Sequence, residues 1–148
     1  MPDPSQTLRS VPSRKPCLTA VLRMAGLRPT RQRVALAELL FGGPHRHVSA
    51  EQLHDEAGRA SVNVSLATIY NTLHQFHEAG LLREVAVDAS RSYFDTDTSD
   101  HHHFYVEDEQ RMIDIPASAV EFKSLPDIPH GMVMSHVDVV IRIRKLQG

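Results

Sequence analysis

Three consecutive histidines, His101, His102 and His103, lie among residues that favour β-strand. Successive side chains of a strand point to opposite faces, so His101 and His103 face one side and His102 faces the other. The run therefore predicts a strand that can supply ligands to two different sites, one on each side of a sheet. Neutral imidazole is a common metal ligand, and three aspartates precede the run. A solvated, acidic and histidine-rich loop is the alternative that this segment leaves open.

The chain has 148 residues and a single cysteine, Cys17. One cysteine can form neither an intramolecular disulfide nor a Cys-x-x-Cys zinc site. We therefore expect no structural zinc of that kind, and a reducing, cytoplasmic setting. The sequence has no apolar run of about 18 residues and no secretory signal, so we expect no membrane partner.

The net charge of -2 is unevenly distributed along the chain. Up to Arg46 the acidic residues are Asp3 and Glu38 alone, among many arginines, whereas carboxylates dominate residues 84–127. A basic front and an acidic, histidine-bearing back suggest a polyanion partner at one end and a cation at the other.

The first half of the chain has the pattern of a series of helices. Residues 1–16 are rich in proline and predict a flexible tail. A helix is expected over about residues 17–25, and a second follows Thr30, whose side chain suits an N-cap. A third, short helix begins after Ser49. Ser49 and Gln52, the third residue of this helix, fit a capping box.

A fourth helix is predicted from Leu66 to Ala79, before Gly80. Its apolar stripe, which we expect to pack inward, consists of Leu66, Ile69, Leu73 and Phe76. The other side is almost uncharged and offers hydrogen-bonding groups: Thr68, Tyr70, Asn71, Thr72 and Gln75. Such a surface suits the base edges of DNA, where amides can pair with adenine and an aromatic ring can contact a thymine methyl group.

Two short strands around residues 88–90 then predict a hairpin. This order of elements is that of a winged helix-turn-helix: two helices, a capped short helix, a polar-faced helix and a hairpin. In that fold the second helix of the helix-turn-helix enters the major groove. Arg28, Arg31 and Arg33 cluster at the start of the second helix, where free backbone amides favour an anion. Phosphate contact and solvated charge are equally compatible with that cluster.

The second half predicts strands over residues 100–107 and 110–115, and a helix over 117–125 that begins after Pro116. A long alternating strand is expected over residues 132–145. One face of this strand is β-branched throughout: Val133, Val137, Val139, Ile141 and Ile143. Such a face must be covered, and with little chain left, a second copy of the subunit is the expected cover.

The predicted fold class is therefore α+β. An N-terminal winged helix-turn-helix DNA-binding domain occupies residues 17–95, and a small α/β domain for dimerisation and metal or haem sensing occupies residues 96–148.

The order of these motifs resembles the ferric uptake regulator family of dimeric, metal-responsive DNA-binding repressors, and most closely its haem-responsive iron response regulator branch. The matching stretches are Ala25-Gly26-Leu27-Arg28-Pro29-Thr30, His47-Val48-Ser49-Ala50-Glu51, Ala67-Thr68-Ile69-Tyr70, Phe76-His77-Glu78-Ala79-Gly80-Leu81 and His101-His102-His103. Together they cover residues 20–143, and their order and spacing carry the resemblance.

The resemblance implies two metal sites. The first, between the domains, would use His47, Asp95, His101, His103 and Asp114. The second, within the dimerisation domain, would use Asp100, His102, Glu121 and His136. Imidazole and carboxylate ligands without thiolate suit Zn, Fe or Mn. The haem-responsive branch further implies haem at the three consecutive histidines, His101, His102 and His103.

In the DNA-binding half, the resemblance places the base-reading aromatic residue at Tyr70 and the minor-groove basic residue at Arg28. The full set of expected DNA-binding residues is Arg28, Thr30, Arg31, Arg33, Thr68, Tyr70 and Asn71. Asn71 stands where many relatives have arginine, so we expect a different operator.

The expected function is that of a homodimeric regulator of iron homeostasis, mainly a repressor, which binds operator DNA and responds to haem, a divalent metal or both. A zinc- or manganese-responsive regulator of the same family without haem sensing is the first alternative. A metal-dependent hydrolase built on the three histidines is a remote one, because it leaves the polar-faced helix unexplained. We therefore do not expect an enzyme.

Overall fold

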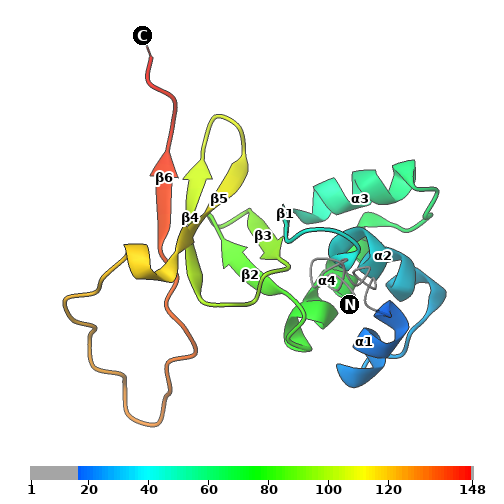
Figure 1. Cartoon of the computed structure of the whole chain (residues 1–148), viewed down its shortest axis with the longest axis horizontal. Helices are drawn as coiled ribbons and strands as arrows, with labels where there is room; N and C mark the ends of the chain where they lie inside the picture. The colour runs from blue at the N-terminus through cyan, green and yellow to red at the C-terminus, as the bar shows by residue number, and fades with distance from the viewer. Residues whose placement is uncertain (1–16, 148) are drawn as a thin grey trace, which may run out of the picture.

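The computed structural model describes residues 17–147, which form a helical part followed by a part built mainly of strands (Figure 1). The first part contains α1 (Leu18–Met24), α2 (Arg31–Phe41), β1 (His47–Val48), α3 (Ala50–Arg59), α4 (Leu66–Glu78), β2 (Arg83–Ala86) and β3 (Ser92–Asp95). The second part contains β4 (His101–Val106), β5 (Arg111–Pro116), a 3-10 turn (Ala117–Ala119) and β6 (Val140–Ile143). The α+β fold class is confirmed, whereas the predicted tail, residues 1–16, lies outside the described residues.

Polar residues cap α2, α3 and α4, and the caps of α2 and α3 were predicted from the sequence. The Thr30 hydroxyl accepts a hydrogen bond from the backbone N–H of Arg33 at 3.2 Å at the start of α2. Ser49 and Gln52 form a complete capping box on α3, with hydrogen bonds of 3.2 and 2.9 Å. Ser65 caps α4 in the same way. Each cap contributes about 1 kcal/mol. No helix within residues 17–147 is long and apolar enough to cross a membrane.

The core of the first part lies between the helices and the inner face of β1 and β3. Its largest members are Leu22, Leu36, Leu40, Val48, Leu53, Ile69, Leu73, Phe76 and Phe94. Two predictions for α4 were wrong: Thr72 is buried, and Leu66 is exposed. Thr72 follows Ile69 by three positions and therefore lies on the same helix face, whereas Leu66 begins the first turn, at the edge of the core.

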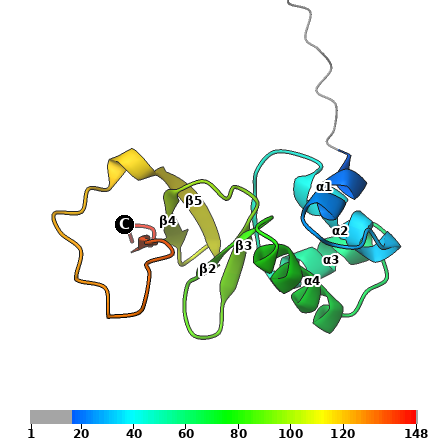
Figure 2. The ribbon, with the colours of Figure 1, turned by 90° about the horizontal axis from the view of Figure 1, so that it is seen from below.

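Two three-stranded sheets follow each other along the molecule, with the helices gathered at one end and β2 and β3 in between (Figure 2). The first sheet has the order β1-β3-β2 and is antiparallel. The second has the order β5-β4-β6, with β5 antiparallel and β6 parallel to β4. A second apolar cluster joins the two sheets and consists of Val85, Val87, Tyr93, Tyr105 and Met112.

The segment between β5 and β6 differs from its prediction. The expected helix over residues 117–125 is a single 3-10 turn, and the expected strand over residues 132–145 is reduced to β6. Residues 120–139 form a wide, largely exposed loop (Figure 1). A helix of this length is marginal without a packing partner, and β6 has only β4 to pair with, over four residues.

Candidate metal centre and nucleic-acid interface

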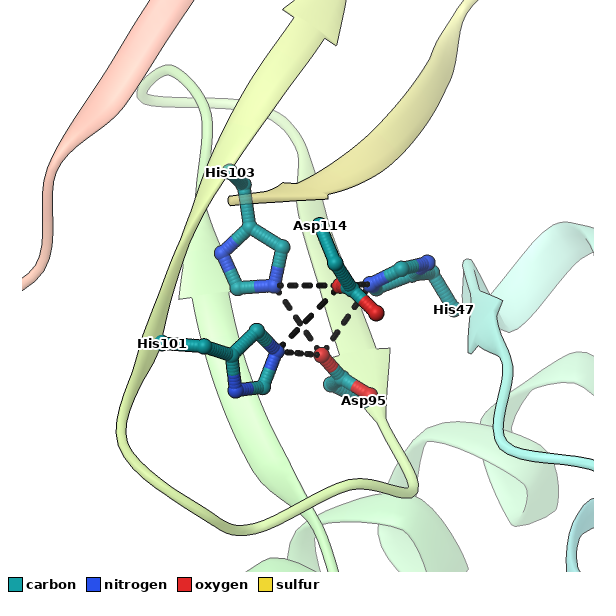
Figure 3. Close-up of side chains that lie close together, drawn as sticks. All are labelled: His47, Asp95, His101, His103 and Asp114. Carbon is teal, nitrogen blue, oxygen red and sulfur yellow. Dashed lines mark hydrogen bonds and ion pairs between the residues drawn. The ribbon is translucent and has the colours of Figure 1, made fainter. Parts of the chain in front are cut away.

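Five side chains converge where the two sheets meet (Figure 3). They are His47, Asp95, His101, His103 and Asp114, which we call the metal cluster. Each offers one ligand atom, and these atoms lie within 4.8 Å of one another. The structure thus brings together all the residues that the resemblance implied for the interdomain site.

Strand register explains why these residues meet. His47 on β1 is paired with Asp95 on β3 in the first sheet. His103 on β4 is paired with Asp114 on β5 in the second sheet. His101 lies two residues before His103 and therefore on the same face of β4. Each sheet supplies one cross-strand pair, so the metal cluster connects the two sheets.

One carboxylate lies at the centre of the metal cluster. The Oδ2 atom of Asp95 is 3.0 Å from Nε2 of His47, 2.8 Å from Nε2 of His101 and 3.0 Å from Nε2 of His103. The Asp95 side chain is 1% exposed, whereas that of Asp114 is 49% exposed. Asp114 places its Oδ1 atom 2.7 Å from Nε2 of His47 and closes the cluster from the solvent side.

The hydrogen bonds of His101 suit a proton or a metal ion between its Nε2 atom and Asp95. Its Nδ1 atom lies 2.7 Å from the backbone carbonyl oxygen of Ser99, which can only accept, so Nδ1 carries the proton. The Nε2 atom of a neutral ring then presents a lone pair to Asp95 Oδ2 at 2.8 Å. Two acceptors at this distance repel unless a proton or a metal ion lies between them. Metal-binding histidines commonly donate their other N–H to a carbonyl in this way, so the donor set fits a divalent ion.

The same contacts shift the pKa values of the cluster. Burial lowers the pKa of the His47 imidazole, but hydrogen bonds and charge from Asp95 and Asp114 outweigh burial and raise it. Burial also opposes protonation of His101, yet the Ser99 carbonyl and Asp95 raise its pKa. Burial would raise the pKa of the Asp95 carboxyl, but contacts with His103 and His47 hold it well below its usual range. Asp95 is therefore ionised, and protons compete with a metal ion for the imidazoles.

The second implied site is not assembled among residues 17–147. Its expected ligands are Asp100, His102, Glu121 and His136. His102 does lie on the opposite side of β4 from the metal cluster, as alternation predicts, and its Nδ1 atom accepts a hydrogen bond from the Val139 N–H at 3.1 Å. His136, however, pairs with Asp138 at 3.0 Å. Glu121 and His136 belong to the exposed loop before β6, and no group of three or more metal-ligating side chains within residues 17–147 includes either of them.

The three histidines expected to bind haem do not face one ligand. His101 and His103 point their Nε2 atoms at Asp95 (Figure 3). His102 lies on the other face of the strand, where it contacts the Phe122 ring edge-on at 5.8 Å between ring centroids. A single planar macrocycle cannot use all three imidazoles in this arrangement.

The polar face of α4 is available for contact with a large partner. Tyr70 is 37% exposed, and Asn71 is exposed beside it. The Tyr70 hydroxyl donates a hydrogen bond to Oε1 of Glu51 on α3 at 2.6 Å. The Thr68 hydroxyl lies 2.9 Å from that of Ser65, so it is partly engaged at the helix cap.

The arginines near α2 have different environments. Arg28 and Arg31 are exposed. Arg33 instead donates to the Arg28 carbonyl and to Oε1 of Gln75, both at 3.0 Å, and so connects α2 to α4. Thr30 is occupied as the cap of α2. Within residues 17–147, the side chains of Arg28 and Arg31 form no hydrogen bond or ion pair, whereas Arg33 and Thr30 hold the helices in place.

Two residues with long-range contacts were not identified from the sequence. Glu51 binds Tyr70, as described above. Arg83 on β2 is buried, donates to the Ser99 carbonyl at 3.1 Å and forms an ion pair with Asp138. A buried arginine in a short strand is unusual and could have signalled a partner, but nothing in the sequence indicated which carboxylate it would find.

Comparison with known proteins agrees with this architecture. The sequence matches the model of a protein family, the ferric uptake regulator family, over residues 24–142. A peroxide-responsive repressor of Staphylococcus aureus (strain Mu50) is 36% identical over 95 residues, and the match spans 64% of this chain and 64% of the length of that relative.

Solved structures give the same result. The chain is similar to the Pseudomonas aeruginosa ferric uptake regulator with manganese, at 28% identity and a TM-score of 0.66 over 87% of this chain and 98% of the other. The Vibrio cholerae ferric uptake regulator, at 21% identity, has a TM-score of 0.68 over 86% of this chain and 99% of the other and supports the fold alone. The chain belongs to the ferric uptake regulator family, whose members are transcription regulators rather than enzymes.

Proposed function

We propose that this protein is a homodimeric, sequence-specific DNA-binding regulator, mainly a repressor, whose DNA affinity depends on a divalent ion held by the metal cluster. One observation carries the proposal: ligand atoms from both sheets converge within 4.8 Å. His47 and Asp95 belong to the helical, DNA-binding part, whereas the other three ligands belong to the second part. The side chains that would hold the ion are therefore also the side chains that connect the two parts.

This arrangement suggests how the ion would control α4. A ligand changes an equilibrium only through its different affinity for two states. Because the metal cluster is complete only when β1 and β3 lie against β4 and β5, the ion favours that arrangement. We infer that the arrangement sets the pose of each α4 helix in the dimer and hence the affinity for operator DNA.

The donor atoms are imidazole nitrogen and carboxylate oxygen, which suit Fe, Zn and Mn alike. Our leading assignment is a regulator of iron homeostasis, because the family is named for ferric uptake regulation. Zinc or manganese response is the alternative, and one similar structure is described with manganese. Haem has no support from the geometry, since His102 faces away from His101 and His103.

On the DNA side, we assign base contacts to Thr68, Tyr70 and Asn71 on α4, and phosphate contacts to Arg28 and Arg31. An uncharged, hydrogen-bonding helix face suits direct reading of base edges, and basic residues beside it position the duplex through its backbone.

We assign dimerisation to the second part of the chain. Large apolar side chains are exposed there: Phe122, Leu125, Ile128, Met132, Val133, Met134 and Ile141. So many exposed apolar groups in one region favour a protein interface. A second copy of the chain is the cover we propose, and it would also give the irregular loop before β6 something to pack against.

The proposal can be tested by selecting operators from random duplexes with the purified protein, and then measuring retention in gel shifts. Tyr70→Ala should abolish specific retention while sedimentation still shows a dimer; His54→Ala, an exposed change on α3, is the matched control. Retention should also require Fe(II), Zn(II) or Mn(II) and should be lost in His103→Ala. A titration with haem, followed by its absorption spectrum, tests whether haem binds the chain. Operator binding that no metal affects would contradict the proposal.

A further inference from the structure

One side chain on the exposed face of α4 is held by a different helix. The Tyr70 hydroxyl lies 2.6 Å from Oε1 of Glu51, a length typical of a hydrogen bond from a hydroxyl to a charged carboxylate. Glu51 stands in the first turn of α3, whose start is fixed by the capping box of Ser49 and Gln52. The phenol is therefore held at a defined position by a well-anchored neighbour.

The same contact favours one charge state of this pair. The hydrogen bond from Tyr70 lowers the pKa of the Glu51 carboxyl, and the bond to Glu51 raises the pKa of the Tyr70 phenol. The proton therefore stays on the phenol oxygen and points at Glu51. Glu51 and Tyr70 line a cavity of about 530 Å³ between α3, α4 and the β2–β3 hairpin. Arg91 also lines this cavity, but its guanidinium contacts the Tyr105 hydroxyl rather than the Glu51 carboxylate.

This bond limits what Tyr70 can offer to DNA. A phenol has one donor hydrogen and two acceptor lone pairs. With the hydrogen directed at Glu51, the hydroxyl can only accept. In the major groove the available donors are the amino groups of adenine and cytosine, whereas guanine presents N7 and O6 and thymine presents O4, all of them acceptors.

We propose that Glu51 is a positioning residue for base specificity, which takes the hydroxyl proton of Tyr70 and restricts this tyrosine to base edges that offer an amino group, or to the methyl group of thymine. The inference rests on the proposed role of α4 as the helix that reads DNA. Acceptor edges are disfavoured in two ways: the hydroxyl has no hydrogen left to give them, and the Glu51 carboxylate repels them. The same negative charge weakens attraction to phosphates, so Glu51 lowers affinity while it improves discrimination.

The experiment compares specificity profiles, in which the binding of each variant to every single-base change of the selected operator is measured with metal present. Glu51→Ala should reduce discrimination by roughly 3- to 10-fold at the positions that Tyr70 reads, the value expected for one hydrogen bond. Glu51→Gln should keep most of it, because an amide oxygen still accepts the phenol proton. Asp55→Ala, which removes another exposed carboxylate of α3, should leave the profile unchanged.

A double-variant comparison shows whether Glu51 acts through Tyr70. Tyr70→Phe should relax the same positions, and adding Glu51→Ala to it should change nothing further. Ultraviolet titrations isolate the Tyr70 phenol as the difference between each background and the same background with Tyr70→Phe. The Tyr70 pKa should be lower in the Glu51→Ala background than in wild type. Circular dichroism verifies that each variant is folded.

Several results would overturn the inference. They are an unchanged profile in Glu51→Ala, additive effects of the two substitutions, and equal losses in Glu51→Gln and Glu51→Ala. In each of these cases wild type still binds its operator specifically, so the proposed function stands while the role of Glu51 is refuted. A wild-type protein that selects no duplex at all refutes the proposed function and the inference with it.

Discussion

Asp95→Asn removes the negative charge at the centre of the metal cluster while the side chain keeps its size. Oδ2 of Asp95 lies 2.8–3.0 Å from the Nε2 atoms of His47, His101 and His103. The side chain is buried, so an asparagine must occupy the same position. Its neutral amide oxygen is a weaker ligand than a carboxylate, and we expect the fold to persist while metal affinity falls.

The size of this loss can be bounded. Removing a hydrogen-bonding partner of a metal ligand costs about 10- to 100-fold in affinity, and removing an anionic ligand should reach at least the upper value. A factor of 100 corresponds to about 2.7 kcal/mol. Because metal stabilises the folded protein through mass action, the variant should lose about 2.7 kcal/mol of metal-induced stabilisation at fixed metal concentration. For a chain of this length that equals roughly 10 °C in Tm.

Competition titration against a chelating dye measures the affinity, and scanning calorimetry with and without Zn(II) measures the change in Tm. Asp97→Asn is the matched control, since it removes the same charge two residues away. Asp97 accepts hydrogen bonds from the backbone N–H and the hydroxyl of Ser99, at 3.0 and 2.6 Å, and is not part of the metal cluster. Wild-type metal affinity in Asp95→Asn, or an equal loss in both variants, would refute the assignment of the cluster.

Three further predictions concern other parts of the molecule. Metal affinity should fall as the pH decreases through neutrality, because the raised pKa values of His47 and His101 make protons compete with the ion. Calorimetry in two buffers should detect proton release on metal binding, and a metal affinity independent of pH would count against this competition. Phe76→Ala should destabilise the fold by about 3–5 kcal/mol, since the ring is fully buried; denaturant unfolding measures this, and a loss below about 1 kcal/mol would mean that the site is poorly packed. Val133→Asp should yield a monomer in sedimentation experiments, because this 91% exposed side chain lies in the proposed dimer surface; a persistent dimer would place the interface elsewhere.

The helices were predictable because their signals are local. Thr30 and Ser49 each cap the helix that follows, as predicted, and the capping box with Gln52 is complete. A cap depends only on residues within one turn, so the sequence contains all the information needed. Alternation along β4 was equally local and correctly separated His102 from the histidines on either side.

The errors occurred where structure depends on distant partners. The helix expected after Pro116 and most of the strand expected after residue 132 have little to pack against within one chain. Arg83 finds Asp138 across 55 positions, and no local pattern encodes that contact. Thr72 is different, because its spacing from Ile69 was visible, and its polar character alone led to the wrong prediction.

The metal cluster was predictable from the sequence only in part. Alternation indicated that His101 and His103 share a face, but their meeting with His47 depends on how the two sheets pack. That arrangement follows from register pairs in both sheets and from the apolar cluster between them. Only the family resemblance, and not the residue pattern, identified His47 and Asp114 as partners before the structure did.

The most direct test is the distance between the two parts of the chain with and without metal. Spin labels on cysteines introduced at His54 on α3 and at Glu107 after β4, with Cys17 changed to serine, report that distance by pulsed electron resonance; an excess of unlabelled chain isolates the intrachain signal. Adding Zn(II) or Mn(II) at a concentration that saturates wild type but not the weaker site of Asp95→Asn should shift the distance distribution and narrow it in the wild-type background, and should do neither in Asp95→Asn. A distribution that is the same with and without metal would contradict the claim that the ion connects the DNA-binding part to the rest of the protein.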